Sequence, residues 1–513
     1  MTDLRAHLEA LRAADDLVTL ERPTTPSPQV VAAEALRENA PAIRLEAEAS
    51  QGVAVDLVSG LYGGVDASTS RDRHPWTRLG LGLGLVGPDA NRSGDGTNGR
   101  NRGRTLERGV ADRETDDADG ETDRARGREP RYVEVLEAIA DLGTRVDERD
   151  VTYAERAAVA ADRTLEDLGL PSPPDGGRPR FSLGLLSIGT DRGSYWAPVH
   201  GEVVDETTLN ARVPAAILQR IDREGVEAAT VALGVPAAAL AATTLLAVTD
   251  RLSTPIEDRC VGSRVPVIPT AGGVVPSSAE VVLETRVGEP RADGIEGRDA
   301  RSREAWETVV DGATLELEVT GAFARGDAVV PFAPLGVPLS DDLHLTALAL
   351  SAALFDRVNG YWGVSPVDWL LLPPAGRLGV CVVSTEVLYA GFEWQLANFL
   401  FSFSDCFDTV VIVDEGTDPR DFGRVLCDLW VKAHPARDWL FSEPDAPAAS
   451  APAYGGDGTG VRLYVDATWD PRWKEEYVAP RVSFRDSYPP EIREAVRESW
   501  SDLGFESELD DAR

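Results

Sequence analysis

Residues 181–330 form the block of the sequence that most restricts the fold, because five of its segments have strand character: FSLGLLSIG, SYWAPVHGEVV, EAATVALGV, SAEVVLETRV and ATLELEVTGAF. Apolar residues alternate with polar ones at a period of two, and Gly and Asp residues separate the segments. This pattern predicts an antiparallel β-barrel or β-sandwich, and spacing alone does not decide between the two.

The segments on both sides of this block alternate between helix and strand patterns. Residues 1–86 read as helix, short strand, helix and strand. After Pro334, the strand-like segments DWLLLPP, GVCVVSTEV and DTVVIVDEG alternate with the helical segments EWQLANFLFSF and DFGRVLCDLWVKA. Such alternation is typical of βαβ units. The sequence therefore predicts a multidomain α+β or α/β protein.

Changes of composition predict four parts along the chain. They are an N-terminal α/β domain over 1–86, a polar insertion over 87–130, a central barrel-like domain over 131–330 and a C-terminal α/β domain over 331–500. The insertion contains no aromatic residue and very few large aliphatic ones. It cannot bury enough apolar surface to offset its chain entropy, and we expect it to be disordered.

The net charge of −35 arises from 86 acidic against 51 basic residues, and only Lys432 and Lys474 are lysines. A surface coated with carboxylates stays hydrated at high salt, where charge repulsion is screened. We therefore expect a halophilic protein; an acidic surface that serves one basic partner is the alternative. No basic face is visible that would neutralise phosphates, so nucleic acid is not an expected partner.

The most apolar run, VALGVPAAALAATTLLAV at 231–248, is long enough to span a membrane, but Gly234 and Pro236 interrupt it near its start. A buried strand, a turn and a buried helix explain it better. The first residues, MTDLRAHLEALRAADDL, predict a charged amphipathic helix capped by Asp3 and not a signal peptide. We expect a soluble cytoplasmic protein without a membrane segment.

Several residues are candidates for chemistry when they are taken one at a time. His200 ends an apolar strand and is either a ligand or a structural residue; Glu257 is either a site residue or a solvated loop acid. Asp293 and Glu296 form an acid pair on a Gly-rich loop, which suits general acid–base catalysis when one of them is desolvated. Four cysteines and five histidines lack the paired spacing of a disulfide scaffold or zinc site.

The segments considered together are similar to the UbiD family of decarboxylases, in the family's order and over nearly the whole chain. The resemblance rests on DLRAHLEALRAADDLVTL, DRGSYWAPVHG, VALGVPAAALAATT, VPSSAEVVLET, VVIVDEGTDPRD, HPARDWLF and VRLYVDAT. It implies an N-terminal α/β domain, a central split β-barrel of the flavin-reductase type and a C-terminal α/β domain that often mediates oligomerisation.

The same resemblance implies a cofactor set and a reaction. The family uses prenylated FMN with a divalent metal, usually Mn²⁺, and a monovalent cation, and it decarboxylates aromatic or α,β-unsaturated acids. The modified flavin serves as the electron sink while the protein supplies placement and proton transfer. A small carboxylic acid is then the expected ligand, and a homo-oligomer or a mixed oligomer with a homologue is the expected assembly.

Two registers carry the family's site residues onto the strand pair at 187–201. When the shared VHG is aligned, the metal-binding Asn falls at Asp191 and the catalytic Arg at Trp196. A rival register keeps Arg192 as the arginine and puts Ser187 in place of the Asn. We favour the first register because it shortens the hairpin turn. The resemblance puts Ser187, Ile188, Gly189, Thr190 and Trp196 beside the cofactor.

The remaining family positions are only partly kept. The metal-binding Glu corresponds to Glu257, five residues before Gly262, but the metal-binding His falls near Val213 or Pro214, where there is no imidazole.

In the acid loop, Asp293 takes the place of the first Glu, Arg298 takes that of the proton donor, and Glu296 lies two positions away. The resemblance thus leaves two hypotheses, namely a decarboxylase with a remodelled site or a non-catalytic homologue that acts as a scaffold or regulatory partner.

Overall fold

The computed structural model describes residues 2–21, 28–47, 55–63, 74–85, 130–146, 151–154, 159–160, 164–166, 168–173, 177–291, 304–334, 340–362, 365–418, 421–443, 446–447, 459–469, 488–500 and 502. The chain divides into two compact units, Met1–Ala467 and Thr468–Arg513. The insertion predicted over 87–130 lies outside the described residues except for Pro130. The four predicted boundaries stay predictions.

The first sheet contains four strands in the order β1-β2-β3-β13. Its strands and the three helices near them in the sequence are β1 (Leu17–Glu21), β2 (Ala42–Glu46), β3 (Val55–Ser59), β13 (Ala328–Pro331), α1 (Leu4–Ala13), α2 (Pro28–Arg37) and α3 (Thr77–Gly82). The predicted cap of the first helix is confirmed, because the Asp3 carboxylate accepts the Ala6 N–H at 2.8 Å. β13 pairs in parallel with β3, so a strand from far along the chain completes this sheet.

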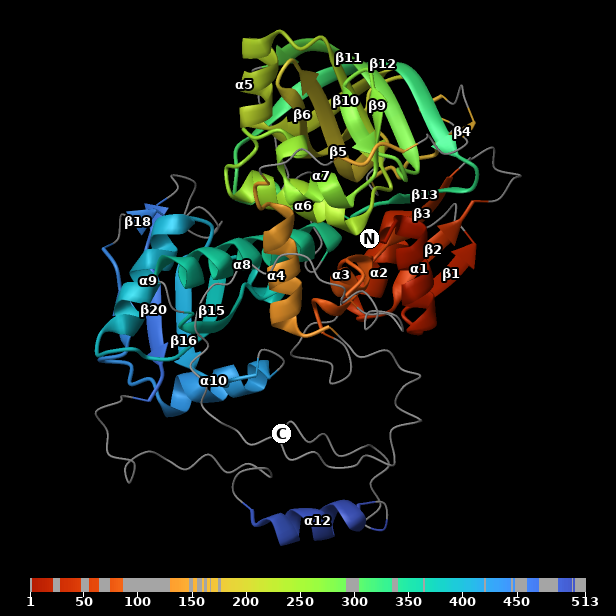
Figure 1. Ribbon diagram of the computed structural model, residues 1–513. Coiled ribbons are helices and arrows are strands. Elements are labelled where there is room, and N and C mark those ends of the chain that lie inside the picture. The colour runs from red at the N-terminus through yellow and green to blue at the C-terminus, as the bar shows by residue number, and fades with distance from the viewer. Residues whose placement is uncertain are drawn as a thin grey trace. The chain divides into compact units, whose positions relative to one another are not determined.

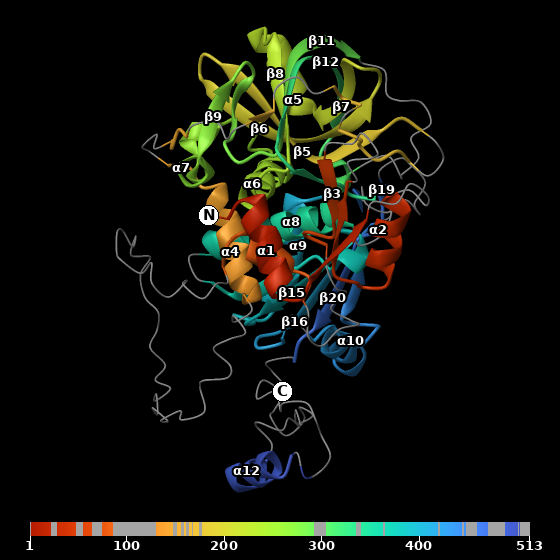
Figure 2. The same cartoon turned by 90° about the vertical axis from the view of Figure 1, so that its right-hand side faces the viewer.

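The central block folds into a closed antiparallel barrel of six strands, which decides between barrel and sandwich (Figures 1 and 2). The strand order is β11-β8-β5-β6-β7-β12, and pairing of β11 with β12 closes it. The strands are β5 (Arg180–Thr190), β6 (Gly193–Val203), β7 (Thr208–Pro214), β8 (Ala228–Leu233), β11 (Val281–Arg291) and β12 (Gly312–Arg325). Three shorter strands accompany them: β4 (Val159–Ala160), which pairs with β12, and the hairpin β9 (Val267–Thr270) and β10 (Gly273–Pro276).

The apolar run at 231–248 is the predicted strand, turn and helix. β8 ends at Leu233, Gly234 turns with a φ of +65°, and α6 (Ala237–Val248) follows with all residues from Ala237 to Ala247 buried. A side chain at Gly234 would approach the Val329 carbonyl oxygen to 2.6 Å, so the turn requires glycine. The other helical segments near the barrel are α4 (Tyr132–Leu142), α5 (Ala215–Glu224), α7 (Cys260–Arg264) and the 3₁₀ turns Ile256–Asp258 and Ala305–Thr308.

The predicted C-terminal βαβ pattern is also present. A five-stranded sheet has the order β14-β15-β16-β20-β17, in which β15, β16 and β20 run parallel and the two edge strands are antiparallel. Its elements are α8 (Asp341–Tyr361), β14 (Val367–Leu371), the 3₁₀ turn Pro374–Gly376, β15 (Val380–Thr385), α9 (Phe392–Phe403), β16 (Thr409–Asp414), α10 (Phe422–Val431), β17 (Trp439–Phe441) and β20 (Leu463–Ala467). A small ladder joins β18 (Ala446–Pro447) and β19 (Thr459–Gly460).

Helix α4 links the barrel part of the sequence to this sheet, because the buried Tyr132 hydroxyl donates to the Leu370 carbonyl at 2.7 Å. The second unit contains α12 (Pro490–Glu498). Across the described ranges, every helix is too short or too polar to cross a bilayer.

Candidate functional site

The strand pair at 187–201 is a hairpin with a two-residue turn. Thr190 pairs with Gly193, so Asp191 and Arg192 form its tip. Ser187 and Trp196 lie opposite each other further along the same two strands. Each of the two registers therefore has one candidate residue at the tip, Asp191 or Arg192, and one further along the strands, Trp196 or Ser187.

The tip of this hairpin borders a cavity of about 1000 Å³, which we call the hairpin-tip cavity. The other walls come from the end of α5, the start of β8, the 3₁₀ turn before α7 and the β9–β10 hairpin. It is lined by Tyr153, Gly189, Thr190, Asp191, Arg192, Gly193, Ser194, Arg223, Glu224, Gly225, Val226, Glu227, Ala228, Glu257, Ala271, Gly273 and Val274. Three of the residues predicted to bind metal or act in catalysis, Asp191, Arg192 and Glu257, thus share one cavity.

The backbone fixes the position of the Glu257 carboxylate. Both of its oxygens accept the Ser194 N–H, each at 3.0 Å. The short loop between α6 and α7 brings Glu257 to this point, and Gly262 permits the tight turn, because a side chain there would lie 2.4 Å from the Ile256 carbonyl oxygen. The five-residue spacing between Glu257 and Gly262 therefore has a local structural reason.

Gly193 holds the hairpin against this carboxylate. Its φ is +132°, and an added Cβ would lie 2.9 Å from both the Glu257 Oε2 and the Pro255 Cβ. Only glycine fits such a conformation in so little space. The carboxylate of Glu257 therefore lies directly against the backbone of the hairpin.

Positive groups face the same cavity. Arg192 and Arg223 line it together with the Glu224 carboxylate. Burial alone would raise the pKa of Glu224, but a hydrogen bond from Thr190 and the charges of nearby arginines outweigh burial and lower it. Glu224 therefore stays ionised, and its partner Arg220 donates to it at 2.8 Å while stacking 3.9 Å from the centre of the Tyr195 ring.

Ser187 and Trp196 do not line the cavity. Trp196 is 1% exposed, and its indole N–H donates to the Val274 carbonyl at 2.7 Å; the Ser187 hydroxyl donates to the same oxygen at 2.8 Å. Ile188 is also buried, whereas Gly189 and Thr190 reach the cavity. The two inner side chains thus fasten β10 to the hairpin.

No histidine supplements the carboxylates at the hairpin tip. All five histidines fall within described residues, and none lines the cavity. Val213, near which the family's histidine falls, is fully buried in β7. Over the parts of the chain that are described, no cluster of three or more His, Cys, Asp or Glu side chains could hold a metal ion. Asp293, Glu296 and Arg298 lie outside the described residues.

The structure shows a buried polar network that the sequence interpretation did not identify, at the opposite end of β6. His200 lies with its Nε2 2.6 Å from the Glu307 Oε1, and Arg212 donates to the Glu307 Oε2 at 2.6 Å. Burial would raise the pKa of Glu307, but hydrogen bonds from His200 and Arg212 lower it to about 2. His200 is thus a structural residue in the barrel wall. The bulky Trp306 beside Glu307 was the one local signal of burial.

A second buried acid lies one turn before this network. Glu304 accepts the Leu183 N–H at 2.7 Å and the Trp306 indole N–H at 2.9 Å. Burial raises its pKa to about 7, against the opposing effect of His200.

A closed antiparallel barrel, preceded by one α/β sheet and followed by another, defines a class of multidomain proteins with mixed α/β content. Residues 345–467 match the family model of the UbiD C-terminal domain, which is described as the C-terminal domain of 3-octaprenyl-4-hydroxybenzoate carboxy-lyase. The pyrrole-2-carboxylic acid decarboxylase of Pseudomonas aeruginosa is 25% identical over 371 residues, which cover 67% of this chain and 73% of that protein.

Solved structures of UbiD-class enzymes share the fold. The vanillic acid decarboxylase of Sedimentibacter hydroxybenzoicus in open form aligns with a TM-score of 0.67 at 18% identity, covering 98% of this chain and 100% of that one. An evolved dimeric form of the UbiD-class enzyme HmfF from Pelotomaculum thermopropionicum, in complex with prFMN, aligns with a TM-score of 0.62 at 16% identity, covering 96% and 100%. The resemblance to the UbiD-like decarboxylase family is confirmed.

Proposed function

We propose that this chain is a prenylated-FMN-dependent decarboxylase of an aromatic or heteroaromatic carboxylic acid. The observation that carries the proposal is the gathering of Asp191, Arg192 and Glu257 around the hairpin-tip cavity. The names of the relatives support the substrate class, since one is a pyrrole-2-carboxylic acid decarboxylase and another a vanillic acid decarboxylase. The prFMN complex of HmfF supports the cofactor.

The residues of the cavity fit the phosphate end of such a cofactor together with a cation. A phosphate beside Asp191 and Glu257 would be repelled unless a cation lay between them, and hard divalent cations prefer oxygen ligands. Arg192 and Arg223 supply the positive charge that a phosphate needs. Mn²⁺ and a monovalent cation belong to the proposal, with fewer protein ligands than a site that includes histidine.

When bound, the flavin supplies the electron sink into which the bond to CO₂ breaks. The chain's own residues then bind and orient. Glu257 holds its charge at a fixed place because the Ser194 N–H is shared between both oxygens. Asp293 and Glu296 stay predictions for proton transfer, as do the homo-oligomer and the mixed oligomer.

The direct test is a visible absorption spectrum and a mass analysis of the released flavin. The protein is co-expressed with a flavin prenyltransferase and purified in high salt. We expect stoichiometric prenylated FMN, followed by release of CO₂ from a panel of pyrrole-2-carboxylate and phenolic acids. A folded protein that takes up neither flavin nor Mn²⁺ would refute the proposal.

Matched variants locate the site. Glu257→Gln keeps the acceptor for Ser194 but removes the charge, and we expect Mn²⁺ content and bound flavin to fall together by about 10-fold or more. Glu206→Gln removes an acid from the exposed turn after β6 and should change neither. Equal losses in both variants would mean that general surface charge, and not the cavity, governs uptake.

The alternative function is that of a non-catalytic homologue which acts as a scaffold or regulatory partner. The buried Trp196 at the family's arginine position and the absence of histidine from the cavity lining favour it. Cofactor uptake without CO₂ release from any acid in the panel, together with association with a second homologue from the same cell, would support this alternative.

A further inference from the structure

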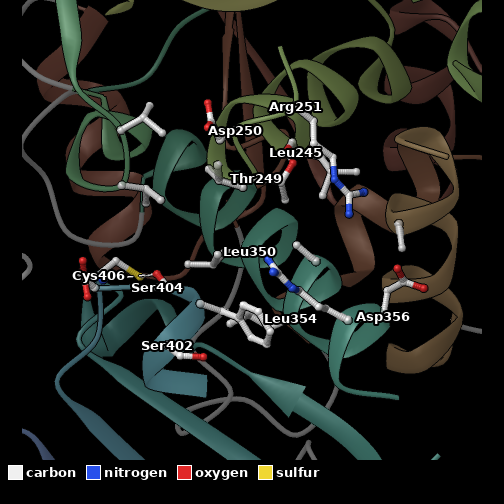
Figure 3. Close-up of a pocket in the computed structure, with 18 of the residues that line it drawn as sticks. Leu245, Thr249, Asp250, Arg251, Leu350, Leu354, Asp356, Ser402, Ser404 and Cys406 are labelled. Atoms are coloured by element: carbon white, nitrogen blue, oxygen red, sulfur yellow. Dashed lines mark hydrogen bonds between the residues drawn. The ribbon is translucent and has the colours of Figure 1, made fainter. Parts of the chain in front are cut away.

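A second cavity, of about 360 Å³, lies where the C-terminal end of α6 meets α8 and the loop after α9 (Figure 3). It shares no lining residue with the hairpin-tip cavity. We call it the arginine cavity, because Arg251 and Arg357 both line it. Its size is within the range usual for small-molecule sites.

The two guanidinium groups reach the arginine cavity from different parts of the sequence. Arg251 follows α6, and Figure 3 shows its side chain extending toward α8. Arg357 belongs to α8, and its guanidinium carbon lies 3.5 Å from the centre of the Phe403 ring. Stacking on an aromatic ring restricts the rotamers of an arginine, so this charge is held in place.

Within the described ranges, neither arginine makes an ion pair with a carboxylate. Asp405 lines the cavity, but it pairs with Arg462 at 2.7 Å. Asp250 and Asp356 also line the cavity, and in Figure 3 their carboxylates point away from Leu350. Burial lowers the pKa of Arg357, and the charge of Arg251 lowers it further. Two like charges thus face one cavity in a chain of net charge −35.

The rest of the lining offers apolar contact. Leu245, Leu350 and Leu354 are buried there, 2–3% exposed. The hydroxyl groups already donate within the protein: Thr249 to the Leu245 carbonyl at 2.6 Å and Ser402 to the Phe399 carbonyl at 2.6 Å. The guanidinium groups are therefore the main side-chain hydrogen-bond donors left for a ligand.

We propose that the arginine cavity binds a small organic acid, whose carboxylate bridges Arg251 and Arg357 and whose apolar ring lies on the leucines. A guanidinium fork matches a carboxylate in a bidentate geometry, and an anion between the two arginines removes their mutual repulsion. The inference concerns a cavity separate from the hairpin-tip cavity and does not depend on the decarboxylase proposal.

Benzoate is the probe, and benzyl alcohol is the neutral control of similar shape. Binding is followed by calorimetry and by the rise in Tm, at one fixed ionic strength. We expect benzoate to bind and to raise the Tm, and benzyl alcohol to bind at least about 10-fold more weakly, because a charge-assisted hydrogen bond is lost.

Arg251→Gln and Arg357→Gln should each weaken benzoate binding by about 10-fold or more. Arg437→Gln removes an exposed arginine of the C-terminal domain and should leave binding unchanged. Both cavity arginines are exposed residues, so the variants should fold, and the Tm without ligand checks this. Benzoate affinity that is equal in all three variants, or no detectable binding, would overturn the proposal.

Flavin-free and flavin-loaded protein distinguish the origin of the acid. Equal, arginine-dependent binding in both forms indicates an effector acid that binds independently of the cofactor. Arginine-dependent binding in the loaded form alone indicates the substrate of the proposed reaction. Because Glu257→Gln tests the hairpin-tip cavity separately, failure of one proposal leaves the other open to its own test.

Discussion

Charged side chains near the two ends of strand β6 lie in very different surroundings. At the His200 end, Glu307 joins the imidazole and the Arg212 guanidinium, and the side chains of all three are at most 8% exposed. At the Gly193 end, Asp191 and Arg192 are exposed, and Glu257 accepts only a backbone N–H among the bonds described for it.

The difference separates structural charges from those available to a ligand. Burial of a charge is tolerated only when partners compensate for lost hydration, so the Glu307 network is complete within the protein. The charges at the hairpin tip keep most of their binding capacity free. The same type of residue thus stabilises the barrel at one end of β6 and is offered to solvent at the other.

The largest predicted effect comes from the same substitution made at each end. Glu307→Ala should lower the free energy of unfolding by about 3–5 kcal/mol, because it leaves His200 and Arg212 buried without their partner. Glu257→Ala should cost only about 1 kcal/mol, the value of one hydrogen bond. Urea unfolding in high salt measures both. Equal losses would show that the two ends do not differ in the way proposed.

The next effect concerns the backbone of the hairpin. Gly193→Ala should destabilise the protein by about 1–3 kcal/mol and displace Glu257, because the new Cβ meets Glu257 and Pro255 at a positive φ. Gly416→Ala is the control: its φ is +72° and it lies outside the hairpin-tip cavity, but an added Cβ has no neighbour within 4 Å, so about 1 kcal/mol is expected. Thermal unfolding and Mn²⁺ binding distinguish simple backbone strain from loss of the carboxylate position.

A further effect is a pH dependence of stability that comes from the buried Glu304, next to the Glu307 network. Glu304 has a pKa of about 7 when folded, against an ordinary value of 4.5, so the folded protein holds this proton more tightly than the unfolded chain does. Its contribution to stability is full below pH 4.5 and is lost as the pH rises through about 7. The slope is at most about 1.4 kcal/mol per pH unit.

Glu304→Gln should flatten this part of the profile. The measurement is the difference in unfolding free energy between the wild-type protein and the variant, from pH 4.5 to 7.5 at constant salt. Glu307 is present in both proteins, so its contribution, which is lost as the pH falls from about 4.5 through about 2, cancels in this difference. A difference that stays constant with pH would mean that Glu304 is ionised in the folded protein.

Local sequence patterns predicted most of the helices and strands, but they did not predict the strand pairing that closes the barrel. The alternation in 181–330 identifies the barrel strands, and Gly234 with Pro236 correctly divides the apolar run into strand and helix. The choice between barrel and sandwich depended on pairing of β11 with β12, a contact that no local period encodes. The resemblance to a family, and not periodicity, pointed to the split barrel.

The sequence identified residues of the candidate site, but it did not determine how they are arranged. Asp191, Arg192 and Glu257 were named from the sequence, but two registers of the hairpin stayed open, because a shift along a strand changes which side chains share a face. The structure puts Arg192 at the tip and Trp196 in the interior. Glu307 was missed because one buried carboxylate among 86 acidic residues has no sequence signature of its own.

The parallel pairing of β3 with β13 has a consequence for synthesis on the ribosome. Residues 55–59 leave the exit tunnel long before residues 328–331, so the edge of β3 that pairs with β13 has no partner while the barrel strands are being translated. Open edges invite pairing with other chains. All six barrel strands can pair before β13 covers the edge of β3. The sheet whose first strands are translated earliest is therefore completed last.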